Sequence, residues 1–266
     1  MKTTLDTIVD ATRARVRDAR STTNMDELLQ RAQAARVEVL ANRLRRALMS
    51  GNTVNIIAEF KRASPSKGVI NDRADPAEIA RTYEAGGVCA ISVLTEPNFF
   101  QGSLDDLRSV RRAVSLPILL KDFIVDEFQI LEAAEAGADA VLLIVAALQA
   151  EGLAQLQSVA NKLGLDALVE VHTVDELEIA KDIGATLIGV NNRDLKSLEV
   201  SLDVSRHLIA HAPAKVPMIA ESGLRSRDDL IELKRLGYSG FLIGETLMRS
   251  EDAASSLREL VGRSAF

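Results

Sequence analysis

The chain has 266 residues with a net charge of −6, and 47% of the residues are hydrophobic, which suffices for a sizeable buried core. Aromatic residues make up only 3%, without tryptophan, which argues against an all-β sandwich and against a binder that stacks nucleic-acid bases. The acidic balance gives no footprint for a polyanion, so we expect no nucleic-acid partner. Because the sequence shows neither a membrane-spanning stretch nor a signal peptide, it predicts a cytoplasmic protein with no membrane partner.

The first fifty residues have a charge balance of their own, with 10 Lys and Arg against 6 Asp and Glu. Apolar residues recur at helical spacing over 5–16 and again over 28–44, which predicts two helices. We interpret residues 1–50 as a helical extension in front of a barrel of residues 51–266, the two together forming a single domain.

From residue 54 onward, short β-branched runs alternate with stretches of about a dozen residues that have helical spacing, which predicts βα units and a parallel sheet. The eight candidate strands are 54–59, 88–94, 117–121, 139–145, 166–170, 186–191, 216–221 and 239–244. Their ends recur about every 26 residues, as in an eight-fold βα repeat. The predicted fold class is therefore α/β, a TIM (β/α)8 barrel with an N-terminal helical extension.

A glycine comes shortly before each even-numbered strand. These glycines are Gly86, Gly137, Gly184 and Gly237. We expect each to serve as a left-handed helix cap that turns the chain back to the sheet.

Each odd-numbered strand ends on a charged residue. These residues are Glu59, Lys121, Glu170 and Glu221. Because alternate strands fill the same layer of a barrel interior, the four side chains should converge on one ring at the barrel mouth, where such barrels place their chemistry. A buried charge is costly unless it is paired or solvated, so the ring indicates function.

More polar residues join this ring. Lys61 points the same way as Glu59 in an extended chain, and Asn191 and Arg193 lie at the end of the sixth strand. Crowded ammonium and carboxylate groups separate into a proton donor and a proton acceptor, which indicates general acid and base catalysis. Lys121 could act as an acid or form a Schiff base with a carbonyl, and the pattern leaves both open. We interpret His172 as a helix-capping or loop residue near the rim.

The last two strands carry a separate signal. The segments ESGLRS at 221–226 and IGET at 243–246 place Ser222, Gly223 and Gly244 where backbone N–H groups can approach an anion closely. This pair of loops frequently binds phosphate in TIM barrels, so we expect a small phosphorylated substrate. Dinucleotide, P-loop and zinc motifs have no support in the sequence.

Seven ordered motifs cover nearly the whole chain. They are IIAEFKRASPSKG at 56–68, LTEPNFFQGS at 94–103, PILLKDFIVDEFQI at 117–130, LVEVHT at 168–173, IGVNNRDL at 188–195, IAESGL at 219–224 and FLIGETLM at 241–248. Together they resemble the indole-3-glycerol phosphate synthase family of tryptophan biosynthesis. The resemblance implies a carboxy-lyase that closes the pyrrole ring of 1-(2-carboxyphenylamino)-1-deoxyribulose 5-phosphate, releasing CO2 and water, with no metal and no organic cofactor.

The resemblance also implies roles for the ring residues. It makes Lys121 the general acid that protonates the ketone oxygen, rather than a Schiff-base lysine, and Glu170 the general base of the later dehydration. Glu59 and Lys61 would orient the substrate and stabilise the transition state, with Lys61 also near the phosphate.

The other implied residues complete the site around these four. Asn191 and Glu221 complete the catalytic set. The substrate-binding residues are Ser64, Arg193, Ser222, Gly223, Gly244, Glu245, Phe100, Phe123 and Leu195. Among them, the two glycines would hold the phosphate and the last three would wall the anthranilate pocket. An acid cannot donate a hydrogen bond, so we expect Glu245 to serve only through its backbone N–H.

Two alternatives remain beside this function. Phosphoribosylanthranilate isomerase is another phosphate-binding barrel, but it would be expected to use a Cys and an Asp at strand ends, whereas the lone Cys89 lies near the start of its strand. A non-catalytic barrel would bind a phosphate ligand without turnover. We expect a monomer, and association with other enzymes of the tryptophan pathway stays open.

Overall fold

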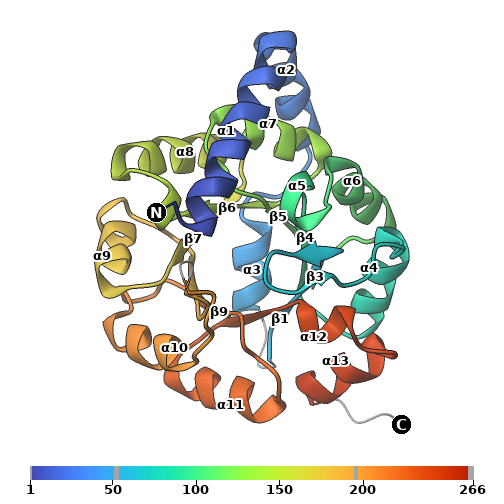
Figure 1. The fold of residues 1–266 in the computed structure, drawn as a ribbon, viewed down its shortest axis with the longest axis vertical. Coiled ribbons are helices and arrows are strands. Elements are labelled where there is room, and N and C mark those ends of the chain that lie inside the picture. Colours follow the sequence, from blue (N-terminus) through green and yellow to red (C-terminus); the bar gives the residue numbers. More distant parts are fainter. Residues whose placement is uncertain (1, 51–53, 195–196, 263–266) are drawn as a thin grey trace.

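The computed structural model describes residues 2–50, 54–194 and 197–262. Eight parallel strands close into a barrel in the order β1-β10-β9-β8-β7-β6-β5-β4, with helices around it (Figure 1). The strands are β1 Ile56–Phe60, β4 Ala90–Leu94, β5 Ile118–Lys121, β6 Ala140–Ile144, β7 Asp166–Val171, β8 Ile188–Asn191, β9 Met218–Glu221 and β10 Gly240–Ile243. This is the TIM barrel that the sequence predicts, and every strand ends within one residue of its predicted end.

Helices follow the strands on the outside of the barrel. They are α4 Pro76–Ala85, α6 Leu104–Ala113, α7 Glu127–Ala136, α8 Ala150–Lys162, α9 Val174–Asp182, α10 Asp203–Leu208, α11 Arg227–Leu236 and α13 Ala253–Val261. Short elements lie between them: β2 Ala63–Ser64, β3 Gly68–Val69, α5 Pro97–Phe100, η1 Val145–Ala147, η2 Ile209–His211 and α12 Glu245–Met248. Side-chain oxygens cap several helix starts, as with Asp75, Ser103, Thr173 and Ser226, because the first N–H groups of a helix have no partner within it.

Three of the four predicted glycine caps are confirmed. Gly137, Gly184 and Gly237 have φ angles of 93°, 68° and 123°, which side chains rarely adopt. The prediction for Gly86 is wrong, because its φ is −72° and the following Gly87, at 86°, makes the turn. With two glycines in a row, the turn can fall one position later.

The barrel interior explains why alternate strands end on charges. Ile57 packs in an apolar cluster inside the barrel, and Glu59, two residues later on the same face, follows it at the mouth. The same spacing joins Leu119 to Lys121 on β5, and it recurs on β7 and β9. A second and larger apolar cluster fills the space between strands and helices. The ring residues are therefore the uppermost layer of side chains in the barrel.

The N-terminal segment contains three helices where the sequence predicts two. They are α1 Thr4–Thr22, α2 Met25–Arg36 and α3 Arg43–Met49. The predicted second helix breaks because Arg36 binds carbonyl groups at the base of the barrel and Asn42 adopts a left-handed φ of 57°. Figure 1 shows α3 in the middle of the ring of strands, and its Leu44 and Leu48 join the interior cluster.

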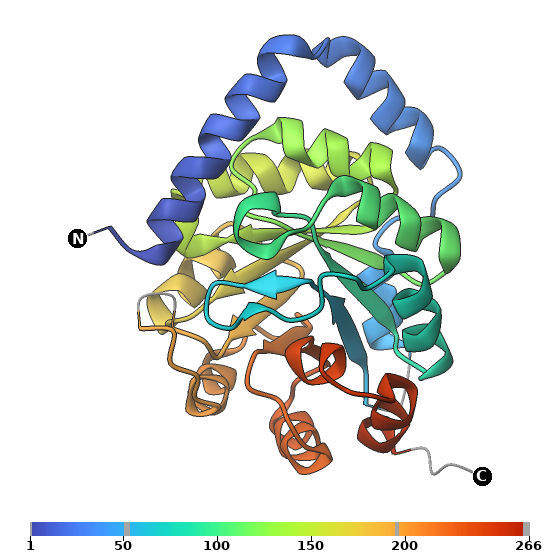
Figure 2. The same ribbon diagram turned by 45° about the vertical axis from the view of Figure 1, so that its right-hand side comes forward.

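A buried carboxylate ties this segment to the barrel. Asp139, which precedes β6 and is 1% exposed, pairs with Arg36, Arg43 and Arg111 at 2.9–3.3 Å. Helix α2 packs along α7, and α1, which precedes it in the chain, lies over the same side of the molecule (Figure 2). Among the described residues, no helix is both long and apolar enough to cross a membrane.

Candidate active site

The ring predicted from the strand ends is present at the barrel mouth. The Nζ of Lys121 lies 3.0 Å from Glu170 Oε2 and 3.2 Å from Glu221 Oε2. Lys61 Nζ lies 2.8 Å from Glu59 Oε1. A β-carbon at Gly189 would lie 2.2 Å from Glu221 Oε1, so only glycine leaves room for this carboxylate. The ring contains two linked sets of charges, one centred on Lys121 and one on Lys61.

Burial and charge act against each other at the centre of the ring. Burial disfavours the ammonium of Lys121, but attraction to Glu170, Glu221 and Glu59 outweighs it and raises the pKa of Lys121 above its ordinary value. Burial likewise opposes ionisation of Glu170, yet Lys121, His172 and a hydrogen bond from Asn191 Nδ2 at 3.2 Å hold its pKa below the ordinary value. Lys121 is thus a charged donor, and Glu170 an ionised acceptor.

The third carboxylate behaves differently. Burial, and repulsion from Glu170 and Glu59, raise the pKa of Glu221 to about 7 despite the attraction of Lys121. The environment of Glu221 therefore favours its protonated form more than that of an ordinary glutamate, which separates it from the otherwise similar Glu170.

The ring forms part of the wall of a cavity of about 1020 Å³. All of the predicted site residues that the structure describes line it: Glu59, Lys61, Ser64, Phe100, Lys121, Phe123, Glu170, Asn191, Arg193, Glu221, Ser222, Gly223, Gly244 and Glu245. Leu195 lies outside the described residues. The apolar part includes Leu142 and Leu242 from the barrel interior, and the rings of Phe100 and Phe123, 6.1 Å apart, offer an aromatic surface.

The loops after β9 and β10 form the other end of the cavity. Ser222 and Gly223 both have left-handed φ angles, 66° and 79°, which turn the backbone sharply after β9. A β-carbon at Gly244 would lie 2.5 Å from Glu59 Oε1, so this glycine lets the loop approach the ring closely. Glu245 lies 3.8 Å from Lys67 Nζ and 3.5 Å from Arg249 Nε, both of which line the cavity. Its charge is therefore compensated.

Several lining residues were missed by the sequence reasoning. Thr4, Leu5 and Ile8 of α1 reach the cavity, although nothing in their local pattern distinguishes them from ordinary residues of an amphipathic helix. Lys67 and Arg225 also line it. Both lie inside motifs already assigned to this site, SPSKG and ESGLRS. Their positive charge, which suits a phosphorylated substrate, is the signal by which the sequence could have identified them.

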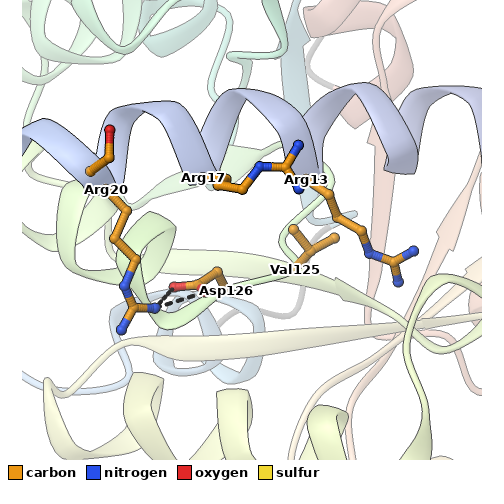
Figure 3. Close-up of a pocket in the computed structure, with 6 residues that line it drawn as sticks. Arg13, Arg17, Arg20, Val125 and Asp126 are labelled. Atoms are coloured by element: carbon orange, nitrogen blue, oxygen red, sulfur yellow. Dashed lines mark hydrogen bonds and ion pairs between the residues drawn. The ribbon is translucent and has the colours of Figure 1, made fainter.

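A second cavity, of about 390 Å³, lies between α1 and the loop after β5 (Figure 3). Arg13, Arg17 and Arg20 line it along one side of α1, and Arg20 pairs with Asp126 at 2.7 Å. It contains none of the ring residues. On the same helix, Arg15 donates two hydrogen bonds to the buried Asp122, next to Lys121.

Cysteine and paired histidines offer no competing site in the described residues. The thiol of Cys89 lies before β4, at the end of the barrel opposite the ring, and burial raises its pKa to about 12. His207 and His211 lie in and just after α10, with ring centroids 5.3 Å apart. No group of three or more candidate metal ligands occurs in the described parts of the chain.

Fold and site together define a (β/α)8-barrel protein with an acid–base site at the carboxyl ends of its strands. The family model for indole-3-glycerol phosphate synthase matches residues 5–260. An indole-3-glycerol phosphate synthase of Carboxydothermus hydrogenoformans is 45% identical over 264 residues, covering 97% of this chain and 99% of its own. The indole-3-glycerol phosphate synthase of Desulfosudis oleivorans is 50% identical over 222 residues, which cover 83% of this chain and 84% of that protein. The chain belongs to the indole-3-glycerol phosphate synthase family.

Solved structures with low sequence identity share the fold. Thiamine phosphate pyrophosphorylase from Pyrococcus furiosus aligns with a TM-score of 0.59 at 18% identity, over 82% of this chain and 95% of its own. N-acetylmannosamine-6-phosphate 2-epimerase from Clostridium perfringens aligns with a TM-score of 0.57 at 14% identity, over 77% and 93%. At such identities the likeness concerns the barrel alone.

Proposed function

We propose that this chain converts 1-(2-carboxyphenylamino)-1-deoxyribulose 5-phosphate to indole-3-glycerol phosphate in tryptophan biosynthesis, as a cytoplasmic carboxy-lyase. The observation that carries the proposal is the buried Lys121, shared between Glu170 and Glu221 in a cavity of a chain of this family. The substrate's phosphate would meet the backbone of Gly223 and Gly244, and its aromatic ring would meet Phe100 and Phe123.

The ring residues divide the chemistry between a donor and an acceptor. As the aryl carbon attacks the ketone, Lys121 donates a proton to the ketone oxygen, and the aryl carboxylate then leaves as CO2. In the dehydration, Glu170 takes a proton from carbon while the hydroxyl group leaves as water with a second proton. Two protons reach oxygen and one leaves carbon, so each turnover takes one proton from solvent.

The short contact between donor and acceptor offers a way to reset them. After one turnover Lys121 is neutral and Glu170 is protonated, and their atoms lie 3.0 Å apart. A proton moving from Glu170 to Lys121 restores both groups. This direction agrees with the raised pKa of Lys121 and the lowered pKa of Glu170.

The test is formation of the indole chromophore from the carboxyphenylamino substrate. We expect turnover by the unmodified chain and a loss of at least about 100-fold in kcat for Glu170→Gln, since a positioned base contributes about 10²–10⁴-fold. Phosphoribosylanthranilate, the substrate of the isomerase alternative, should not react. Tight binding of the carboxyphenylamino substrate in a calorimetric titration without turnover would refute the proposal and support a binding protein.

A further inference from the structure

His172 lies beside Glu170 at the end of β7, with a side chain that is 11% exposed. Its backbone N–H donates to Glu176 Oε2 at 2.6 Å, and its ring Nδ1 lies 3.2 Å from the same oxygen. Because an ionised carboxylate only accepts hydrogen bonds, Nδ1 carries the hydrogen. Glu176, on α9, therefore fixes the orientation of the imidazole ring.

The other ring nitrogen faces the carboxylate proposed as the general base. His172 Nε2 lies 3.5 Å from Glu170 Oε1, and among the described residues this buried nitrogen has no hydrogen-bond partner. A neutral ring with its hydrogen on Nδ1 would turn an unprotonated nitrogen toward a carboxylate oxygen, and two acceptors repel each other. A second proton on the ring converts this contact into an attraction.

The surrounding charges favour that second proton. Carboxylates face His172 from three elements, namely Glu170 on β7, Glu176 on α9 and Glu221 on β9, whereas η1, also packed against α9, carries no charged side chain. The cation of Lys121 pairs with the other oxygen of this carboxylate, Glu170 Oε2. Burial lowers the pKa of His172, but the hydrogen bond to Glu176 and attraction to the three carboxylates outweigh it and raise the pKa above the ordinary value.

Helix capping does not account for this residue. The side chain of Thr173 accepts the N–H of Glu176 and is the N-cap of α9, so the capping half of the interpretation of His172 is wrong. The loop half is confirmed, because His172 lies between the end of β7 at Val171 and the start of α9 at Val174. Its ring is not among the described residues that line the cavity. Its contacts lead instead to Oε1 of Glu170, which also accepts a hydrogen bond from Asn191, while Lys121 donates to the other oxygen, Oε2.

We propose that His172, oriented by Glu176, is a positioning residue for Glu170: its imidazolium holds the carboxylate in place and keeps it ionised until it accepts the substrate proton. This inference rests on the proposed role of Glu170 as general base. Its chemical logic is that of a carboxylate, an imidazole and a second carboxylate in series, in which the outer carboxylate sets the tautomer and the imidazole acts on the group that reacts.

The kinetic test uses His172→Gln, which keeps a polar side chain but cannot become charged. Without the imidazolium the carboxylate of Glu170 is less stabilised, so its pKa rises and the acidic limb of the kcat profile moves up by about one pH unit. We expect kcat on the acidic limb, below the pKa of Glu170, to fall about tenfold, in line with one unit, while kcat at neutral pH changes little and KM stays within about twofold. Glu176→Gln should also move the acidic limb of the kcat profile to higher pH. The matched control is His207→Gln, at an exposed histidine. Superimposable pH profiles for His172→Gln and the unmodified chain would overturn the proposal.

A second measurement needs no catalysis. The chain has only 3 histidines, so the titration of each imidazole can be followed by nuclear magnetic resonance. We expect His172 to titrate above the ordinary histidine pKa of about 6.5, and this pKa to fall in the Glu170→Gln protein. An unchanged His172 titration in that variant would disprove the pairing. If the titration moves but Glu170→Gln remains fully active, the pairing stands and the role of Glu170 as general base is wrong.

Discussion

Replacing Lys121 by methionine removes the proposed proton donor from the centre of the ring while keeping a long side chain. A general acid contributes about 10²–10⁴-fold to a rate, and this lysine also holds two carboxylates, so we expect kcat/KM for indole formation to fall by about 10³-fold or more. Glu170 and Glu221 lie 3.0 Å and 3.2 Å from its Nζ and are almost fully buried. An opposite charge this close lowers a carboxyl pKa by about 1–3 units, so its loss raises the pKa of both groups. The acidic limb of the residual activity should therefore move to higher pH.

The control for this variant is Lys181→Met. It deletes the same charge from a surface pair with Glu178, 2.7 Å away in α9, and should leave kcat/KM unchanged. Thermal unfolding of both proteins checks that they fold. A folded Lys121→Met protein with kcat/KM within about tenfold of the unmodified value would refute general acid catalysis by this lysine, since even the low end of such catalysis exceeds that factor. A limb that moves to lower pH would refute the electrostatic reasoning.

Three further predictions concern stability and substrate affinity. Asp139→Asn leaves three arginines without their shared buried carboxylate and should cost about 3–5 kcal/mol in denaturant unfolding, whereas Asp105→Asn, at an exposed pair, should cost under about 1 kcal/mol. A cost for Asp139→Asn below that of the control would contradict this assignment. Thr4→Asp adds a carboxylate to the cavity wall, so KM should rise severalfold at low salt. Thermal stability should not fall, because a helix N-terminus tolerates acids, and the control Thr4→Asn should leave KM unchanged. Glu245→Gln removes a charge that competes with phosphate for two lining cations, so KM should fall severalfold, and an increase would exclude such competition.

The barrel and the ring could be predicted because both depend on short-range periodicity. The sequence of a strand buried on both faces is a run of apolar residues, so a charged residue at its end, such as Lys121 or Glu170, is easily recognised. The two-residue spacing that places Ile57 inside the barrel also places Glu59 there. Barrel closure then brings alternate strand ends together, so the sequence pattern alone assigns four separate positions to one ring.

The remainder of the site depends on contacts between distant segments. The approach of Ile8 to the cavity follows from the docking of α1 on the barrel, which no local pattern encodes. The break between α2 and α3 depends on Arg36 reaching carbonyl groups more than a hundred residues away. The role of His172 was missed because its spacing places it near the rim but does not say which of its two nitrogens faces Glu170.

The N-terminal segment contacts both ends of the barrel, so its removal would affect the base and the mouth together. At the base, Leu44 and Leu48 of α3 fill the barrel interior, and a β-carbon at Gly240 would lie 2.5 Å from Leu48. At the mouth, α1 lines the cavity, and its Arg15 binds Asp122, the neighbour of Lys121. A deletion through residue 45 would combine a cavity in the core with loss of the wall above the substrate, so a raised KM could not be assigned to either. Substitutions confined to α1 separate the two, because they leave the base of the barrel intact.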